Sequence, residues 1–133
     1  MAEQPFGAPL TRLEDQALLT GDGRYVDDIH LDGTLHAAFV RSPYAHAEIT
    51  RTDCTAARAL PGIHGVYTIE DLSPGMTCRR VPVGFPKPGW CDESGPYVLA
   101  DGEVCHVGEV VAMVVADSRY VAEDAAQMVV VDY

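Results

Sequence analysis

The stretch from Glu103 to Tyr133 constrains the fold most strongly, because its pattern predicts a strand, a helix and a second strand. The residues from Val110 to Ala116 are all apolar and rich in valine, which predicts a strand covered on both faces. After the helix, Val129 to Val131 begin the second strand. This unit carries enough apolar surface to be the centre of a core, and it contains no obvious chemistry.

The ends of the helix in this unit can be placed from capping residues. Asp117 or Ser118 can cap its start, since either side chain accepts a hydrogen bond from a free backbone N–H. Its apolar residues fall on one face of a helix, at positions i, i+4 and i+7: Val121, Ala125 and Met128.

Before the first strand, Gly108 is suited to a tight turn, because glycine adopts positive φ without a Cβ clash. A two-residue loop of type II′ at Gly108-Glu109 would pair Val104 to Val107 with Val110 to Met113. The sequence therefore predicts a hairpin here.

Further elements are predicted upstream of this unit. Leu35 to Arg41 is a strand that is apolar on both faces, and Ala47 to Thr52 alternates as a strand with one wet face. A short helix, Cys54 to Leu60, follows the N-cap residue Asp53 and ends at Pro61-Gly62. The remaining predicted elements are a strand at Gly65 to Ile69 and a helical turn at Glu70 to Leu72.

Two segments lack a regular pattern. Residues 1–34 predict an N-terminal arm and turn, and residues 73–97 predict a long loop rich in proline and glycine, with a short strand at Arg80 to Val83. A loop of this length in a compact domain is usually functional or docks on something else. It carries the only tryptophan, Trp90, which either makes an external contact or folds back onto its own sheet. At 133 residues the chain is expected to form one domain, residues 1–133.

The charge of the chain excludes some partners. With 20 acidic and 9 basic residues the net charge is −11, which repels nucleic acids and anionic membranes. No segment approaches the length of a membrane span, and the first residues lack a signal-peptide pattern, so we expect a cytoplasmic protein.

The residues that could carry chemistry do not form a recognisable motif. The four cysteines have wide, irregular spacing without a C-x-x-C pair, which leaves a zinc site only with distant partners. Cys54 near a helix start could have a lowered pKa, although a small buried side chain is the simpler interpretation. Cys105 and His106 would point to opposite faces of a strand and cannot act as a nucleophile–base pair. The residues thus predict an α+β domain without a self-sufficient active site.

Five segments together resemble a known family. They are Arg12 to Asp15, Leu19 to Ile29, Leu35 to Ala47, Pro61 to Leu72 and Val107 to Ala116, with Val129 to Tyr133 at the end. In this order they are similar to the start of the large subunit of the molybdenum hydroxylases, the xanthine dehydrogenase and aldehyde oxidase family, in its carbon monoxide dehydrogenase form. The segment R-S-P-Y-A-H-A at Arg41 to Ala47 is the most specific of these motifs.

The resemblance implies a fold and a set of cofactors. The fold would be the α/β-hammerhead, a mixed sheet with two short-to-medium helices. The family's large subunit binds molybdopterin, often as the cytosine dinucleotide, while partner subunits or domains carry FAD and [2Fe–2S] clusters. The pterin-binding loops and catalytic glutamate of the family lie downstream, so no catalytic, cofactor-binding or metal residue can be placed in this chain. We therefore expect a fragment or a separately encoded first domain of an oxidoreductase, inactive by itself.

The implied role is structural, namely packing against the remaining large-subunit domains. The predicted docking surface is the turn after the first strand together with the 73–97 loop: Arg41, Ser42, Pro43, Tyr44, His46 and Trp90. Complete hydrogen bonding of Arg41 and His46 within the domain would remove support for it. An exposed apolar face would also allow a homodimer. The alternatives are a free-standing interaction or small-ligand module with the same fold, and a small metal-dependent enzyme using cysteine and histidine, which the spacings disfavour.

Overall fold

The computed structural model describes residues 7, 9, 11–81 and 95–133. Within it, the chain forms two compact units, Met1–Thr34 and Leu35–Tyr133. Every buried apolar side chain among the described residues belongs to the second unit. The core of the molecule is therefore built by residues 35–133.

The first unit contains two short helical segments, α1 (Asp15–Thr20) and the 3₁₀ turn η1 (Val26–Asp28). The prediction of an irregular arm is wrong for residues 15–20, where Arg12 donates its backbone N–H to the Asp15 carboxylate and so starts a helix. Gly21 ends the helix with φ of +80°. Neither segment has a buried residue, so packing within this unit stabilises it little.

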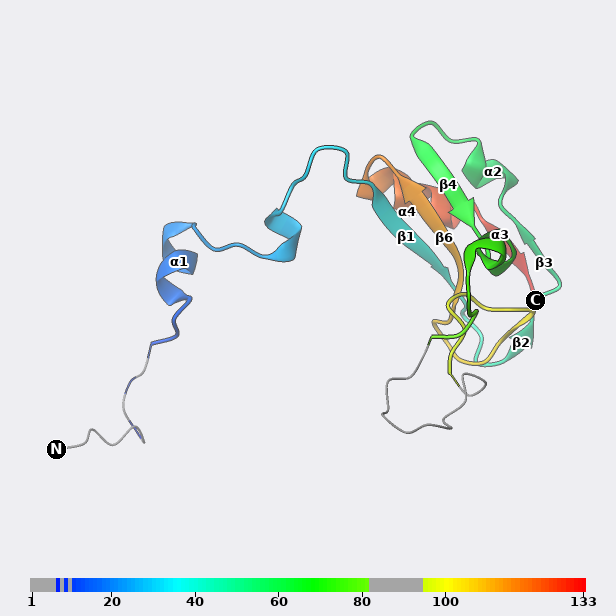
Figure 1. Cartoon of the computed structure of the whole chain (residues 1–133), viewed down its shortest axis with the longest axis horizontal. Helices are drawn as coiled ribbons and strands as arrows, with labels where there is room; N and C mark the ends of the chain where they lie inside the picture. The colour runs from blue at the N-terminus through cyan, green and yellow to red at the C-terminus, as the bar shows by residue number, and fades with distance from the viewer. Residues whose placement is uncertain (1–6, 8, 10, 82–94) are drawn as a thin grey trace. The chain divides into compact units, whose positions relative to one another are not determined.

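A three-stranded antiparallel sheet in the order β1-β6-β4 forms the centre of the second unit (Figure 1). Its strands are β1 (His36–Arg41), β6 (Val110–Ala116) and β4 (Ile63–Tyr67). The predicted bounds of β6 are confirmed. The predicted covering of both faces of β6 holds for one face only, because Met113 and Val115 on the other face are half-buried. On the same side of the sheet, Ala37 and Phe39 of β1 are exposed.

Helix α4 (Arg119–Gln127) lies on one face of β1 and β6 (Figure 1). The predicted cap is confirmed, since the Ser118 hydroxyl accepts a hydrogen bond of 3.3 Å from the Val121 backbone N–H. The buried face of α4 consists of Ala122 and Ala125. Met128 is not part of it: the helix ends at Gln127, and Met128 is 39% exposed.

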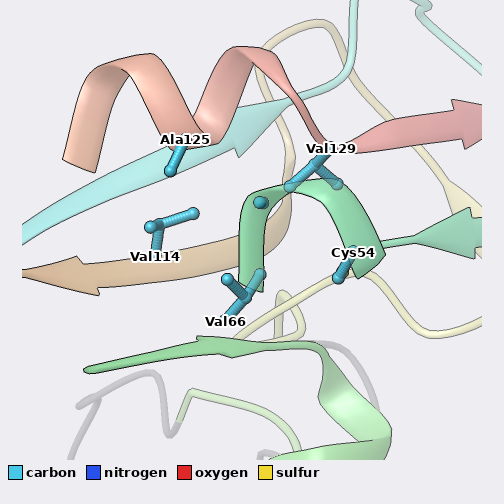
Figure 2. Packing of buried hydrophobic residues seen from close by; sticks show 6 residues of the cluster. Cys54, Val66, Val114, Ala125 and Val129 are labelled. Atoms are coloured by element: carbon cyan, nitrogen blue, oxygen red, sulfur yellow. The ribbon is translucent and has the colours of Figure 1, made fainter. Parts of the chain in front are cut away.

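The main core cluster joins residues from five parts of the second unit (Figure 2). Val66 from β4, Val114 from β6 and Ala125 from α4 converge on Cys54 and Val129. Cys54 precedes the helix α2 (Thr55–Arg58), and Val129 precedes the strand β7 (Val130–Asp132). The predicted strand, helix, strand unit is thus confirmed, and it supplies three of these five residues.

Two small antiparallel sheets lie beside the central one. Strand β2 (Ala47–Glu48) pairs with β5 (Glu103–Val104), and β3 (Arg51–Asp53) pairs with β7. The predicted hairpin is therefore wrong, because β6 pairs on both edges with distant strands and Val104 pairs with Ala47. Gly108 does adopt positive φ, +86°, but within a turn from His106 to Glu109. The single strand predicted for residues 47–52 is divided into two strands with different partners.

The other predicted elements are found with shifted bounds. Helix α2 is shorter than predicted, although the Asp53 carboxylate does accept a hydrogen bond of 2.9 Å from Thr55 N–H. Helix α3 (Ile69–Leu72) follows β4 and leads into the 3₁₀ turn η2 (Ser73–Gly75). At the predicted strand of residues 80–83, Arg80 forms an isolated bridge with Tyr97, and residues 82–94 lie outside the described structure.

These elements confirm the α+β class. Every strand pair in the described ranges is antiparallel, where a mixed sheet was expected, and three shorter α-helices accompany α4. Among the residues placed by the structure, no helix has the length and hydropathy that crossing a membrane requires.

Candidate functional site: a pair of joined turns

The turn after β1 is fixed by Ser42, which is only 2% exposed. Its hydroxyl oxygen accepts a hydrogen bond of 3.0 Å from Tyr44 N–H, and lies 3.3 Å from the Tyr44 carbonyl oxygen. The following Pro43 cannot donate to a sheet ladder, so β1 stops at Arg41. The sequence thus folds locally into a tight polar turn at the end of an apolar strand.

A second turn, residues 105–109, is bonded directly to this one. Ser42 N–H donates to the Glu109 carbonyl at 2.9 Å, and Gly108 N–H donates to the Ser42 carbonyl at 2.8 Å. Arg41 Nη1 donates to the Gly108 carbonyl, also at 2.8 Å. These three bonds join residues 41–46 and 105–109 into one surface, which we call the turn pair.

Glu109 is the buried carboxylate of the turn pair, with 6% of the residue exposed. Its Oε2 atom accepts a hydrogen bond from Cys105 N–H and lies 3.5 Å from His106 Nδ1. A buried carboxylate is costly unless it is hydrogen bonded, and here the backbone of its own turn supplies the donor. Sequence reasoning missed Glu109, because nothing in a local pattern distinguishes a buried glutamate from a solvated one.

The outer edge of the turn pair carries a histidine–carboxylate contact and an aromatic contact. His46 Nε2 lies 2.9 Å from Glu103 Oε2, with side chains 73% and 55% exposed. The rings of Tyr44 and Tyr133 meet edge to face, with centroids 4.9 Å apart. Tyr44 therefore connects the turn pair to the end of the β7 segment.

The six predicted docking residues separate into three groups. Ser42 is buried and bonded within the domain, which removes it from an external contact. Arg41 and His46 each have a partner inside the domain, and both stay exposed. Pro43 and Tyr44 are exposed, whereas Trp90 lies outside the described residues. External docking by this turn stays a prediction, with reduced support from Arg41 and His46.

The thiols of Cys54 and Cys105 are not activated. Burial raises the pKa of Cys54, which is 5% exposed, so the buried structural role is confirmed and the lowered pKa is wrong. Desolvation, followed by the nearby Glu103 and Glu109 carboxylates, raises the pKa of Cys105. Because the thiolate is the nucleophile, neither residue is prepared for covalent catalysis near neutral pH.

The described residues also offer little for binding a cofactor. No three histidine, cysteine or carboxylate side chains among them are grouped to hold a metal ion. Every buried polar side-chain atom in the described ranges has a hydrogen-bond partner. The most enclosed cavity, of about 180 Å³ between β3, α3 and the 100–102 turn, is smaller than the roughly 300 Å³ at which ligand pockets begin. Larger hollows, such as one of about 440 Å³ along Arg58, His64 and Asp71, are open to solvent.

Comparison with known proteins gives a consistent result. The family described as aldehyde oxidase and xanthine dehydrogenase, a/b hammerhead domain, matches residues 20–133. The nicotine 6-hydroxylase large subunit of Paenarthrobacter nicotinovorans is 46% identical over 124 residues, covering 93% of this chain and 15% of that protein. The carbon monoxide dehydrogenase large chain of Afipia carboxidovorans is 42% identical over 130 residues, covering 98% of this chain and 15% of that protein.

Solved structures show the same likeness. A carbon monoxide dehydrogenase from Oligotropha carboxidovorans superposes with a TM-score of 0.77 at 40% identity, over 96% of this chain and 15% of that one. The aldehyde oxidoreductase of Desulfovibrio gigas gives a TM-score of 0.73 at 33% identity, over 91% and 14%. The chain therefore spans about 15% of the length of these relatives, and the predicted hammerhead fold is confirmed.

Proposed function

The chain belongs to the family of aldehyde oxidase and xanthine dehydrogenase a/b hammerhead domains, and from this membership we propose that it is the non-catalytic structural domain of a molybdenum hydroxylase large subunit. The observation that carries the proposal is the match to carbon monoxide dehydrogenase over 96% of this chain and only 15% of that one. A segment of this kind serves as one domain among several in a larger chain. Its role is to pack against the domains that hold the cofactor.

The described residues support a role without chemistry. The thiols of Cys54 and Cys105 have raised pKa values, and the buried polar side-chain atoms of the described residues are already bonded to protein groups. They therefore do not fit a resident pterin or metal. We place molybdopterin, as the cytosine dinucleotide, in the other domains of the large subunit, and FAD and [2Fe–2S] clusters in partner subunits or domains.

Substrate choice is also assigned to the other domains. Relatives named for nicotine and for carbon monoxide are 46% and 42% identical to this chain, so similarity in this domain does not follow the substrate. A fold supports different reactions when the reacting groups are supplied elsewhere. We propose that the domain maintains the architecture of the large subunit for whichever substrate its neighbours select.

A domain exchange tests this proposal. The corresponding segment of the Afipia carboxidovorans large chain is replaced by this chain, and the chimaera is expressed with its partner subunits. We expect an assembled complex that retains molybdenum and carbon monoxide oxidation, while the free chain shows no metal and no turnover. A free chain that binds pterin or oxidises a substrate by itself would contradict the proposal, as would a chimaera that fails to assemble.

A further inference from the structure

The central sheet has two faces of different character. The strand register aligns Ala38, Val114 and Val66 across β1, β6 and β4, and all three are buried. Paired residues in antiparallel strands point to the same face of a sheet. This face is the one that α4 and α2 cover with the core.

The opposite face carries two aligned rows of mainly apolar residues. One row is Ala37, Val115 and Gly65, and the other is Phe39, Met113 and Tyr67. Phe39 is 46% exposed, Ala37 is exposed, and the other four are half-buried. We call these six residues the open face.

On the open face, the Tyr67 ring occupies the space beside Gly65. A Cβ atom at Gly65 would lie 2.5 Å from Cζ and 2.6 Å from Cε2 of the Tyr67 ring, so this ring lies over the backbone of its own strand. At the other edge, the Arg41 guanidinium lies 5.7 Å from the centre of the Phe39 ring. The result is an apolar surface with a cation at one corner, adjacent to the turn pair.

We propose that the open face is the docking site for an apolar surface of another domain of the same large-subunit polypeptide. This inference rests on the proposed function and names the surface that performs it. It places the contact on the sheet, where sequence reasoning placed it on the turn after β1 and on the 73–97 loop.

Area and charge argue against a second copy as the occupant. The open face has six residues, four of them half-buried, whereas each partner of a stable dimer contributes roughly 20–30 residues and buries about 800 Å². Two copies of this chain would also each contribute a net charge of −11 to the repulsion. So small an apolar surface can form a stable contact only with a partner that is held nearby.

A domain on the same polypeptide meets that condition. Covalent linkage gives it an effective concentration of about millimolar, so a contact too small for free association can form. The solved relatives have such a neighbour available, since this chain matches only 15% of their length. We place the partner surface in the remaining 85% of such a chain, so no separate binding partner is required.

Thiol labelling in the domain-exchange chimaera tests the assignment. Ala37→Cys places a small probe on the open face, and Tyr120→Cys places a control on α4, where Tyr120 is 81% exposed. We expect alkylation of the Ala37→Cys thiol to be about tenfold slower or more in the chimaera than in the free chain, because a covered thiol reacts only during local opening. The Tyr120→Cys thiol should react at the same rate in both.

The outcomes separate the inference from the proposed function. If the unsubstituted chimaera does not assemble, both are overturned. If it assembles and the Ala37→Cys thiol stays equally reactive, only the docking surface is wrong. Protection of that thiol in the free chain, increasing with protein concentration, would identify a second copy as the occupant and would also overturn the inference.

A charged substitution provides a second measurement. Phe39→Arg alters a half-exposed side chain, so the free chain should keep its thermal midpoint, while the chimaera should assemble in much lower yield. Tyr120→Arg changes another exposed apolar residue, on α4 and away from both the open face and the turn pair, and should leave the yield unchanged. Equal yields for the two variants would overturn the proposed surface.

Discussion

At the scale of single residues, carboxylates that satisfy backbone donors stabilise the turns of this domain. Asp71 Oδ2 accepts hydrogen bonds from Thr68 N–H at 2.8 Å and from the Thr68 hydroxyl at 3.0 Å, and it pairs with Arg58 at 3.1 Å. The backbone hydrogen bond is the main cause of the lowered pKa of Asp71, with smaller contributions from the hydroxyl and Arg58. The charged form of this residue is therefore favoured in the folded state.

Asp71→Asn should reduce stability in a pH-dependent manner. A carboxyl group with a lowered folded pKa stabilises the protein above its unfolded pKa of about 3.9, and this contribution is lost as pH falls through the folded value. At pH 7 we expect a loss of about 1 kcal/mol or less, because the side chain is 38% exposed and solvent screens it. Urea unfolding at pH 7 and at pH 3 measures the effect, and equal losses at both pH values would contradict it. Asp124→Asn on the exposed side of α4 is the control.

Glu109→Ala should reduce the free energy of unfolding more than a surface substitution does. It leaves the Cys105 N–H of the turn pair without its acceptor. This bond is part-buried, and a fully buried donor left unsatisfied costs about 1–3 kcal/mol, so we expect a loss of about 1–2 kcal/mol. Glu103→Ala, which removes only the exposed pair with His46, should cost less than about 1 kcal/mol. Chemical unfolding compares the two variants, and hydrogen exchange should be faster at the Cys105 amide in Glu109→Ala alone. A similar loss of unfolding free energy in both variants would show that burial of Glu109 contributes nothing to stability.

At the scale of elements, the two faces of the central sheet should respond differently to the same substitution. Val114 and Val115 are neighbours on β6, and only Val114 faces the core. We expect Val114→Ala to reduce the free energy of unfolding by about 2 kcal/mol, from lost burial and the cavity left behind. Val115→Ala on the open face should cost less than about 1 kcal/mol in the free chain. If α4 covered the other face of the sheet, Val115→Ala would reduce the free energy of unfolding more than Val114→Ala.

The elements themselves were largely predictable, and their pairing was not. The apolar run of β6 and the cap at Ser118 are local signals, and both were found where the sequence placed them. The hairpin at Gly108 was wrong because a glycine at a turn indicates a change of direction without identifying the partner strand. Pairing of β6 with β1 and β4 depends on contacts distant in sequence, which periodicity does not encode.

The candidate site was likewise predictable in its local turn and not in its long-range contacts. The turn at Arg41 to His46 was found from Pro43 and the polar residues around it. Its bonds to Gly108 and Glu109 join segments more than sixty residues apart, so the sequence could not show that Ser42 is already satisfied. The open face was hidden for a related reason: an apolar strand has the same sequence whether or not its second face is covered.

At the scale of the whole molecule, we propose that residues 35–133 are the folding unit and that residues 1–34 are an arm attached to it. The buried apolar residues begin at Ala38, and the first 34 residues are fewer than the roughly 40 below which a chain seldom builds a core alone. Deletion of residues 1–34 should therefore change the free energy of unfolding by less than about 0.5 kcal/mol. Limited proteolysis of the intact chain should first cut between residues 11 and 34, because a segment without buried side chains opens easily. Urea unfolding of the two chains and mass analysis of the first cleavage products check both expectations. A loss above about 1 kcal/mol on deletion, beyond the usual range for a surface change, would show that the arm contributes to the core and that the two units fold as one.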